Sequence, residues 1–151
     1  DLYYKLKKIG ADLVYDTVNN IIENKINLKP QINTAKLNSA NKLNKENCRI
    51  DWSMNASKIY NKIRGLSPYP GANCFLDHKN ESLKIIIYSS KIEIESHQLN
   101  SGEIIIERKQ IKISTNDCFL IPKEIKVQGK KRMNISDLMN GFKFDVSSKF
   151  I

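Results

Sequence analysis

The chain has 151 residues, of which 40% are hydrophobic, and it carries a formal net charge of +9 at pH 7. This length provides one domain, or one domain with an appendage, built on a single modest core. Its longest apolar run, residues 85–88, is far shorter than the roughly 20 apolar residues of a membrane helix. The basic excess favours a polyanionic partner, most commonly nucleic acid, although the abundant Lys, Asn and Ile also fit an AT-rich genome.

The cysteines and histidines indicate neither a disulfide framework nor a metal site. Cys48, Cys74 and Cys118 are odd in number, lie far apart and form no Cys-x-x-Cys pair. His78 and His97 belong to no Cys/His cluster. We therefore expect free thiols in a reducing, cytoplasmic compartment and no bound metal.

Residues 1–24 have the periodicity of an apolar-faced helix, which Gly10 weakens at its middle. So apolar a stripe needs a partner surface that 24 residues cannot supply. The chain also begins with Asp rather than Met and has no signal-peptide pattern. We therefore expect the last helix of a preceding domain, in a piece of a longer protein. The apolar stripe consists of Leu2, Leu6, Ile9, Leu13, Val14, Val18, Ile21 and Ile22.

Residues 25–47 have the composition of a basic linker. Pro30 ends any helical run and favours an extended conformation at Lys29. The segment is rich in Asn, Lys and Ser, and its five Lys and one acidic residue give a net charge of +4. We expect an extended path along a surface, with Lys36, Lys42 and Lys45 projecting into solvent or onto a partner.

Residues 53–66 predict a short amphipathic helix. Ser53 is a candidate N-cap and Gly65 a candidate left-handed C-cap. Pro68 and Pro70 then favour an extended path. The apolar face of this helix consists of Ala56, Ile59, Tyr60 and Ile63.

The single tryptophan, Trp52, stands just before this helix. Its favoured role is a hydrophobic plug at one end of a barrel, and the alternative is stacking on a nucleic-acid base. Tyr69, between the two prolines that follow the helix, is also expected to pack.

From residue 72 the hydrophobic period becomes two, which predicts five short strands. Five strands of this size favour an OB-fold-like barrel over residues 48–151, so the fold is predicted as mainly β with flanking helices. A short helix should open at Asn134 or Ser136 and end at Gly141, and the tail, 142–151, should either pack its aromatics on the barrel or fray. The predicted strands are 73–76, 83–94, 102–107, 110–114 and 118–127.

No catalytic motif is recognisable. The chain has no nucleophile elbow, no His-Glu metal motif and no Gly-rich phosphate loop. Asp51 is a lone carboxylate with an expected structural role, and Glu93 and Glu95 fit a solvated strand face. Binding by cations is the remaining chemistry, because Lys and Arg meet phosphates without needing base geometry. The candidate RNA-binding residues are Lys36, Lys42, Lys45, Arg49, Arg64, Lys130, Lys131 and Arg132, which could form one continuous positive face.

Residues 49–53, Arg-Ile-Asp-Trp-Ser, and 63–72, Ile-Arg-Gly-Leu-Ser-Pro-Tyr-Pro-Gly-Ala, closely resemble the methionyl-tRNA formyltransferase family. The resemblance continues in order over nearly the whole chain. Departures are Tyr69, where the family has Trp, and the 116–118 turn, Asn-Asp-Cys, where the family often has Asp-Gly. Further similar stretches are 2–6, 10–14, 42–46, 101–104, 129–133 and 137–138.

The resemblance implies an enzyme that transfers a formyl group from 10-formyltetrahydrofolate to the amino group of initiator Met-tRNA. The family's Asn-His-Asp catalytic set lies in an N-terminal Rossmann-like domain that nothing here matches. The resemblance thus implies that 1–24 is the closing helix of that domain, 25–47 the basic linker and 48–151 the tRNA-binding domain. Such a chain would be inactive alone, hold no cofactor, touch no membrane and be monomeric.

Two alternatives stay open. Formyltransferases acting on nucleotide-linked amino sugars, and the hydrolase part of formyltetrahydrofolate dehydrogenase, share the architecture, but they have less reason for the basic linker and the Gly-Lys-Lys-Arg turn. A free-standing OB-fold module that binds nucleic acid is the other alternative. The apolar stripe of residues 1–24 argues against it, because the stripe would lack a partner.

Overall fold

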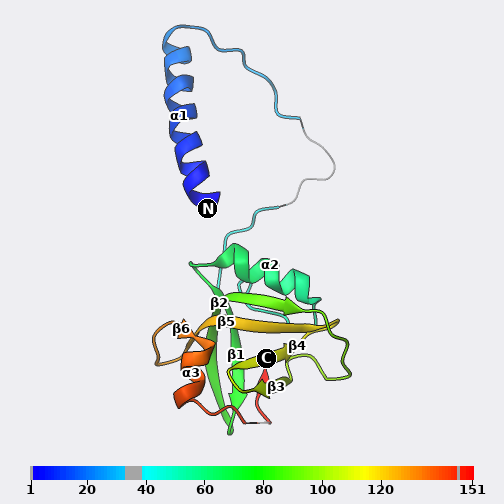
Figure 1. Cartoon of the computed structure of the whole chain (residues 1–151). Coiled ribbons are helices and arrows are strands. Elements are labelled where there is room, and N and C mark those ends of the chain that lie inside the picture. The colour runs from blue at the N-terminus through cyan, green and yellow to red at the C-terminus, as the bar shows by residue number, and fades with distance from the viewer. Residues whose placement is uncertain (1, 33–38, 146) are drawn as a thin grey trace. The chain divides into compact units, whose positions relative to one another are not determined.

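The computed structural model describes residues 2–32, 39–145 and 147–151 (Figure 1). It divides into two compact units, Asp1–Ala40 and Asn41–Ile151. Within the described residues, no helix combines the length and the apolar character needed to cross a bilayer.

The described part of the first unit contains one helix, α1 (Leu2–Ile22), which continues through Gly10. None of its residues is buried, so its apolar stripe makes no core of its own. The helix ends where Asn24 takes a left-handed conformation with φ of 53°. Asn is among the few residues that adopt this conformation readily, so the helix stops before Pro30 is reached.

The described residues of the second unit form a nearly closed antiparallel β-barrel with two helices, and the alternating pattern predicted this barrel. The strand order is β3-β4-β5-β2-β1-β7, and β6 pairs with β5. All five predicted strands are present, whereas the two-residue strands β6 and β7 were too short to show a period. The elements are α2 (Ala56–Leu66), β1 (Ala72–His78), β2 (Glu81–Glu93), β3 (Ile104–Glu107), β4 (Gln110–Ser114), β5 (Phe119–Val127), β6 (Met133–Asn134), α3 (Ile135–Gly141) and β7 (Lys149–Phe150).

The C-terminal tail closes the barrel. β7 pairs with β1 on one side. On the other side, the backbone of Lys149 forms an isolated antiparallel β-bridge with that of Glu103. The Phe150 amide donates to the carbonyl of Gly102 at 2.8 Å. Gly102 has a φ of +87°, and a Cβ there would lie 2.0 Å from the Phe150 carbonyl oxygen. The tail therefore packs on the barrel rather than fraying, and glycine is required where it joins.

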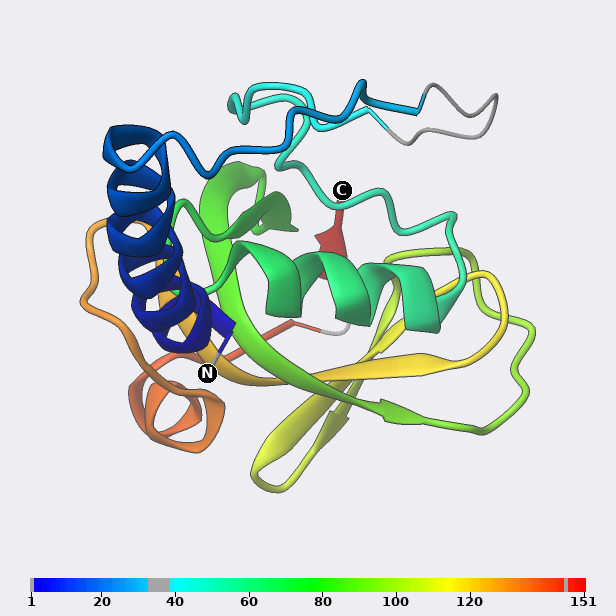
Figure 2. The ribbon, with the colours of Figure 1, turned by 90° about the horizontal axis from the view of Figure 1, so that it is seen from above.

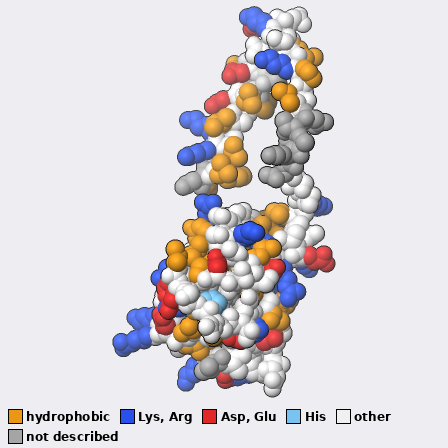
Figure 3. Space-filling view, turned by 90° about the vertical axis from the view of Figure 1, so that its right-hand side faces the viewer, with side chains coloured by type: hydrophobic (Ala, Val, Ile, Leu, Met, Phe, Trp, Pro, Cys, Tyr) orange, Lys and Arg blue, Asp and Glu red, His pale blue; other side chains and the backbone are white. Residues whose placement is uncertain are grey.

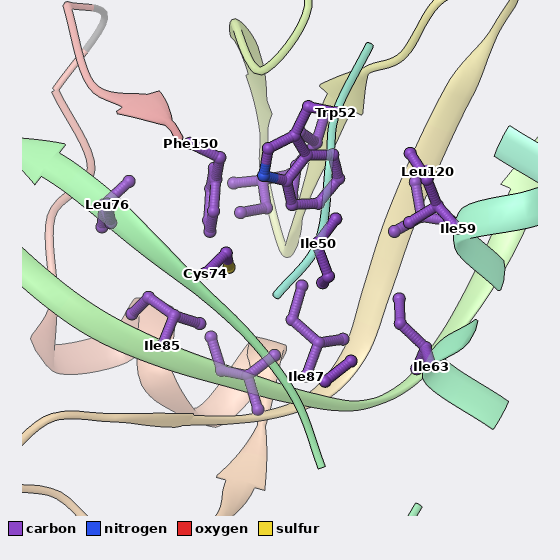
Figure 4. Close-up of a cluster of buried hydrophobic side chains, with 14 of the residues drawn as sticks. Ile50, Trp52, Ile59, Ile63, Cys74, Leu76, Ile85, Ile87, Leu120 and Phe150 are labelled. Atoms are coloured by element: carbon purple, nitrogen blue, oxygen red, sulfur yellow. The ribbon is translucent and has the colours of Figure 1, made fainter. Parts of the chain in front are cut away.

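Trp52 fills the core beside the seam, by which we mean the junction of β7 with the rest of the barrel. Its side chain is 4% exposed, and its ring meets that of Phe150 edge-on with centroids 5.5 Å apart. Figure 4 shows the two rings side by side above Cys74, with Ile50 next to the indole and Ile59 beside Leu120. The plug role predicted for Trp52 is confirmed, because a buried ring is not available to stack on a base.

Two capping predictions for α2 are wrong. Ser53 does not cap the helix: its amide and hydroxyl both donate to the Asp51 carboxylate, and the N-cap position is held by Asn55. Gly65 lies inside the helix, whose C-cap is Ser67. The left-handed conformation occurs instead at Gly71, with a φ of +84°, whose amide donates to the Leu66 carbonyl.

The path after α2 also differs from the prediction. Residues 67–70 form a turn rather than an extended segment. The turn directs Tyr69 into solvent, where its side chain is 89% exposed, so this residue does not pack as expected. The short helix α3 lies where predicted, with Asn134 at its N-cap position.

Candidate nucleic-acid interface

Helix α2 lies against β2 and forms one wall of the barrel unit (Figures 1 and 2). It buries Ala56, Ile59, Ile63 and Leu66. The spacing of these residues follows the helical period, so the opposite face carries polar and charged side chains into solvent.

The N-terminus of α2 is held by Asp117 from the turn between β4 and β5. The Asn55 side chain makes no capping bond. Instead, the Asp117 carboxylate accepts the Ala56 amide at 2.8 Å and the Thr115 hydroxyl at 3.1 Å. These hydrogen bonds, led by the one from the Ala56 amide, lower the pKa of the Asp117 carboxyl. Sequence reasoning missed this role, because the two residues are far apart along the chain.

Lys42 and Lys45 are exposed on a folded segment of the barrel unit, not on an extended linker. Asn44 and Asn47 each accept the other's backbone amide through their side-chain oxygens, at 2.8 and 2.7 Å. The Asn73 side chain donates to the Lys45 carbonyl at 3.0 Å and ties this turn to β1. These hydrogen bonds form only when the segment is folded, so they favour the turn over the extended conformation that was predicted. Lys36 lies outside the described residues.

Arg49 is exposed where this turn meets α2. Its guanidinium lies over the Phe75 ring, 5.4 Å from the centroid. Lys62, on the solvent side of α2, donates to the Arg49 carbonyl. The Lys62 ammonium thus lies at the backbone of Arg49, and sequence reasoning named only Arg49 of these two cationic residues.

Arg64 lies farther along α2 and lines a cleft between this helix and β2. Its guanidinium is held by the Asn61 side chain at 3.2 Å and lies 6.0 Å from the centre of the Tyr60 ring. Tyr60 and Arg64 line the same cleft as Tyr88 of β2. The Arg132 guanidinium stacks on the Tyr88 ring at 4.1 Å.

Arg132 is less available for an anion than its exposure suggests. It donates to both oxygens of Glu124 at 2.6 Å, a paired geometry that lowers the pKa of the Glu124 carboxyl. Its charge is therefore partly compensated. Lys130 and Lys131, in the turn before it, are exposed and border a hollow beside α3.

The predicted cations among the described residues thus occur in three places. Lys42 and Lys45 lie on the segment that leads to Arg49. Arg64 lines the cleft in which Arg132 stacks on Tyr88, and the third place is the turn at 130–131. Acidic side chains stand among them, including Glu46 and Asp51 near Arg49. On the face of the barrel unit seen in Figure 3, Lys and Arg side chains also alternate with acidic ones.

Other polar groups in the barrel are structural. Lys112 binds Glu93, Glu95 and Glu107 on the surface of the sheet. The three cysteines are buried and free, and burial raises the pKa of the Cys74 thiol. Among the described residues there is no cluster of three or more His, Cys, Asp or Glu side chains that could hold a metal ion.

Comparison with known proteins gives the chain its family. Residues 42–143 match the model of the formyl transferase C-terminal domain. Methionyl-tRNA formyltransferase of Flavobacterium johnsoniae is 40% identical over 148 residues, which are 98% of this chain and 47% of that protein. Its counterpart in Flavobacterium psychrophilum is 36% identical, over 95% of this chain and 46% of that protein. The chain thus spans about half the length of these relatives.

A solved structure supports the fold. HypX from Aquifex aeolicus matches 89% of this chain and 24% of its own, with a TM-score of 0.56 and 18% identity. At this low sequence identity, the match supports only the fold of the chain. The matched model covers well over half of the residues, and the relatives align with almost all of them. The chain therefore belongs to the formyl transferase C-terminal domain family.

Proposed function

We propose that this chain is the C-terminal, tRNA-binding portion of a methionyl-tRNA formyltransferase. The observation that carries the proposal is the 40% identity to the Flavobacterium johnsoniae enzyme, which extends over nearly all of this chain but under half of that enzyme. In this proposal, residues 1–24 close the catalytic domain, 25–47 form the linker and 48–151 bind initiator Met-tRNA.

The reaction of the whole enzyme would take its formyl group from 10-formyltetrahydrofolate, and its catalytic groups would lie outside this chain. One HypX structure was determined in complex with tetrahydrofolic acid. In the proposal, the role of this chain is to hold the RNA so that the methionyl amino group reaches a formyl donor bound elsewhere.

The RNA-facing groups in this proposal are the exposed cations on the barrel unit. Their side chains project from ordered turns and from α2, so they can meet phosphates without refolding of the chain. Arg132 contributes through a guanidinium that already pairs with Glu124. The proposed set is Lys42, Lys45, Arg49, Arg64, Lys130, Lys131 and Arg132, with Lys36 outside the described residues.

Binding of Met-tRNA to the 151-residue chain at increasing salt tests the proposal. Each lysine–phosphate contact releases counterions, so the logarithm of the affinity should fall steeply with the logarithm of the salt concentration. Replacing Lys42 and Lys45 together by Ala should make that slope shallower by about two, since roughly one unit is lost per contact.

The matched control replaces Lys109 and Lys123, two exposed lysines on the β3–β4 turn and on β5. It changes the net charge equally but should leave the slope nearly unchanged. Equal effects of the two double variants would refute the assignment of Lys42 and Lys45. Affinity that does not depend on salt would refute the cationic interface altogether. Formylation assays of the full-length protein on Met-tRNA and on sugar nucleotides would separate the proposal from a sugar-modifying enzyme.

A further inference from the structure

The cleft between α2 and β2 has a composition that the cationic surface does not explain. It encloses about 250 Å³ and is lined by Tyr60, Arg64, Tyr88, Ser89 and Ser90, among others. Pockets for drug-sized ligands measure roughly 300–1,000 Å³. This cleft therefore suits one small planar or phosphorylated unit, and a double helix is far too wide for it.

A bulge in β2 creates one wall of this cleft. Ile87 pairs with Ile125 and Ser89 with Glu124, so Tyr88 is an extra residue in the β2 ladder. Such bulges redirect a side chain and are frequent beside functional sites. Here the tyrosine lines the cleft, and the Arg132 guanidinium stacks on its ring. Arg132 donates to both carboxylate oxygens of Glu124. Its guanidinium is therefore held against the Tyr88 ring in the absence of a ligand.

The next wall contains an unpaired hydroxyl group. The Ser90 side-chain oxygen is buried and has no hydrogen-bond partner among the described residues. A buried polar group left without a partner costs stability, so native structures rarely keep one without a reason. Ser90 belongs to the lining of the cleft, where a bound molecule could supply the missing partner.

The electrostatics of the cleft favour an anion with an aromatic part. Among the described residues no Asp or Glu lines it, and its polar side-chain groups are the Arg64 guanidinium and five hydroxyls. Arg64 is steadied by Asn61 and by the neighbouring Tyr60 ring. Guanidinium and hydroxyl groups donate to phosphate and ribose oxygens, while tyrosine rings provide surfaces for a base. A nucleotide combines all three chemistries.

We propose that this cleft receives one unpaired nucleotide of the bound RNA. Its base would lie against the tyrosine rings, its phosphate would meet Arg64, and Ser90 would donate to it or accept from it. Recognition of an unstacked base by aromatic and Arg side chains is the usual way in which proteins read single-stranded RNA. The inference rests on the proposed RNA-binding function and adds to it a site that a fully paired helix could not occupy.

The test compares two probes: an RNA hairpin with a short single-stranded 3′ end, and the same hairpin with a blunt end. Ser90→Ala should weaken binding of the single-stranded probe by about two- to tenfold, the effect of one hydrogen bond. It should leave the blunt probe unaffected and should not lower the melting temperature, because the removed hydroxyl has no internal partner. The control, Ser82→Ala, alters an exposed serine on the same strand and should change neither affinity.

A second pair of variants tests the stacking. Tyr88→Leu should weaken binding of the single-stranded probe by about 5- to 150-fold, the range for losing one stacked base, whereas Tyr88→Phe should retain it. Circular dichroism confirms that each variant is folded. Competition by inorganic phosphate alone, equal to that by the single-stranded probe, would mean a simple anion site and would overturn the inference.

The outcomes separate the two proposals. If both hairpins bind the native chain but Ser90→Ala and Tyr88→Leu leave binding of the single-stranded probe unchanged, the inference fails and RNA binding stands. Equal losses for both hairpins would also overturn it, because the cleft would then serve as general surface. Failure of every RNA, including Met-tRNA, to bind would overturn the inference and the proposed function together.

Discussion

Removing the Asp117 carboxylate should destabilise the barrel through the start of α2, although the two lie far apart in sequence. Asp117 accepts the Ala56 amide at 2.8 Å, and the side chain of Asn55 at the N-cap makes no capping bond to the helix. Loss of a capping side chain costs about 0.5–2 kcal/mol. Because Asp117 is exposed, we expect Asp117→Ala to lower the free energy of unfolding by about 1 kcal/mol.

Asp117→Asn separates the hydrogen bond from the charge. An amide oxygen still accepts the Ala56 amide, but it lacks the negative charge that favours a helix N-terminus, an effect of about 0.3–1 kcal/mol. Its loss should therefore be smaller than that of Asp117→Ala. Urea unfolding measures both variants. The control is Asp77→Ala, which removes an exposed acidic side chain on β1, away from the start of α2 in the chain.

The pH dependence provides an independent check. In the folded state, hydrogen bonds to the Asp117 carboxylate lower its pKa below the unfolded value of about 3.9. Its contribution is therefore present above that pH and is lost as the pH falls through the lower, folded pKa. The stability gap between the native chain and Asp117→Asn should close in the same acidic range. Equal stability of Asp117→Ala and Asp77→Ala at neutral pH would refute the capping role.

Three other substitutions have defined outcomes. Gly102→Ala would place a methyl group 2.0 Å from the Phe150 carbonyl oxygen, so it should open the barrel seam and speed amide exchange at Phe150 while β2 and β5 stay protected. Trp52→Ala should lower the unfolding free energy in urea by about 3–5 kcal/mol, because the indole is buried, and a smaller loss would mean that the core collapses around the gap. Lys112→Met should be destabilising at neutral pH, because hydrogen bonds to Glu93 and two further glutamates raise the pKa of Lys112. The contribution of Lys112 is fully present below its unfolded pKa of about 10.4 and is lost as the pH rises through the higher folded pKa. The loss caused by Lys112→Met should therefore begin to shrink above about pH 10.4, and a gap that stays constant up to about pH 12 would contradict the ion-pair network.

Alternation and periodicity predicted the barrel because its strands bury one face each. The pattern in 110–114 marks β4 at its observed ends, since Ile111 and Ile113 are buried in the core while Gln110 and Lys112 are only partly buried. The spacing of Ile59 and Ile63 likewise marks the buried face of α2. These signals are local, so they are readable without knowing the contacts.

The capping errors have the opposite cause. Ser53 is a sound N-cap by composition, but Asp51 is closer to its hydroxyl and competes successfully. The actual stabilising group, Asp117, arrives only when the β4–β5 turn folds against α2. Local propensity could not anticipate an acceptor from another element.

The candidate site likewise has features that the sequence predicts and features that depend on contacts between strands. Its cations could be named from composition, because charge and exposure go together for Lys and Arg. The pairing of Arg132 with Glu124, and the extra residue that turns Tyr88 toward the cleft, depend on the register between β2 and β5.

From the sequence alone we could predict the class of the fold, its helices and its five longer strands, the family resemblance and the excess of positive charge. Each of these follows from residue identity and short-range spacing. The three-dimensional contacts were needed to show that β7 closes the barrel, that Trp52 packs on Phe150 and that the Ser90 hydroxyl, in a cleft beside Arg64, has no partner among the described residues. Those features depend on long-range contacts between segments, and such contacts leave no periodic trace along the chain.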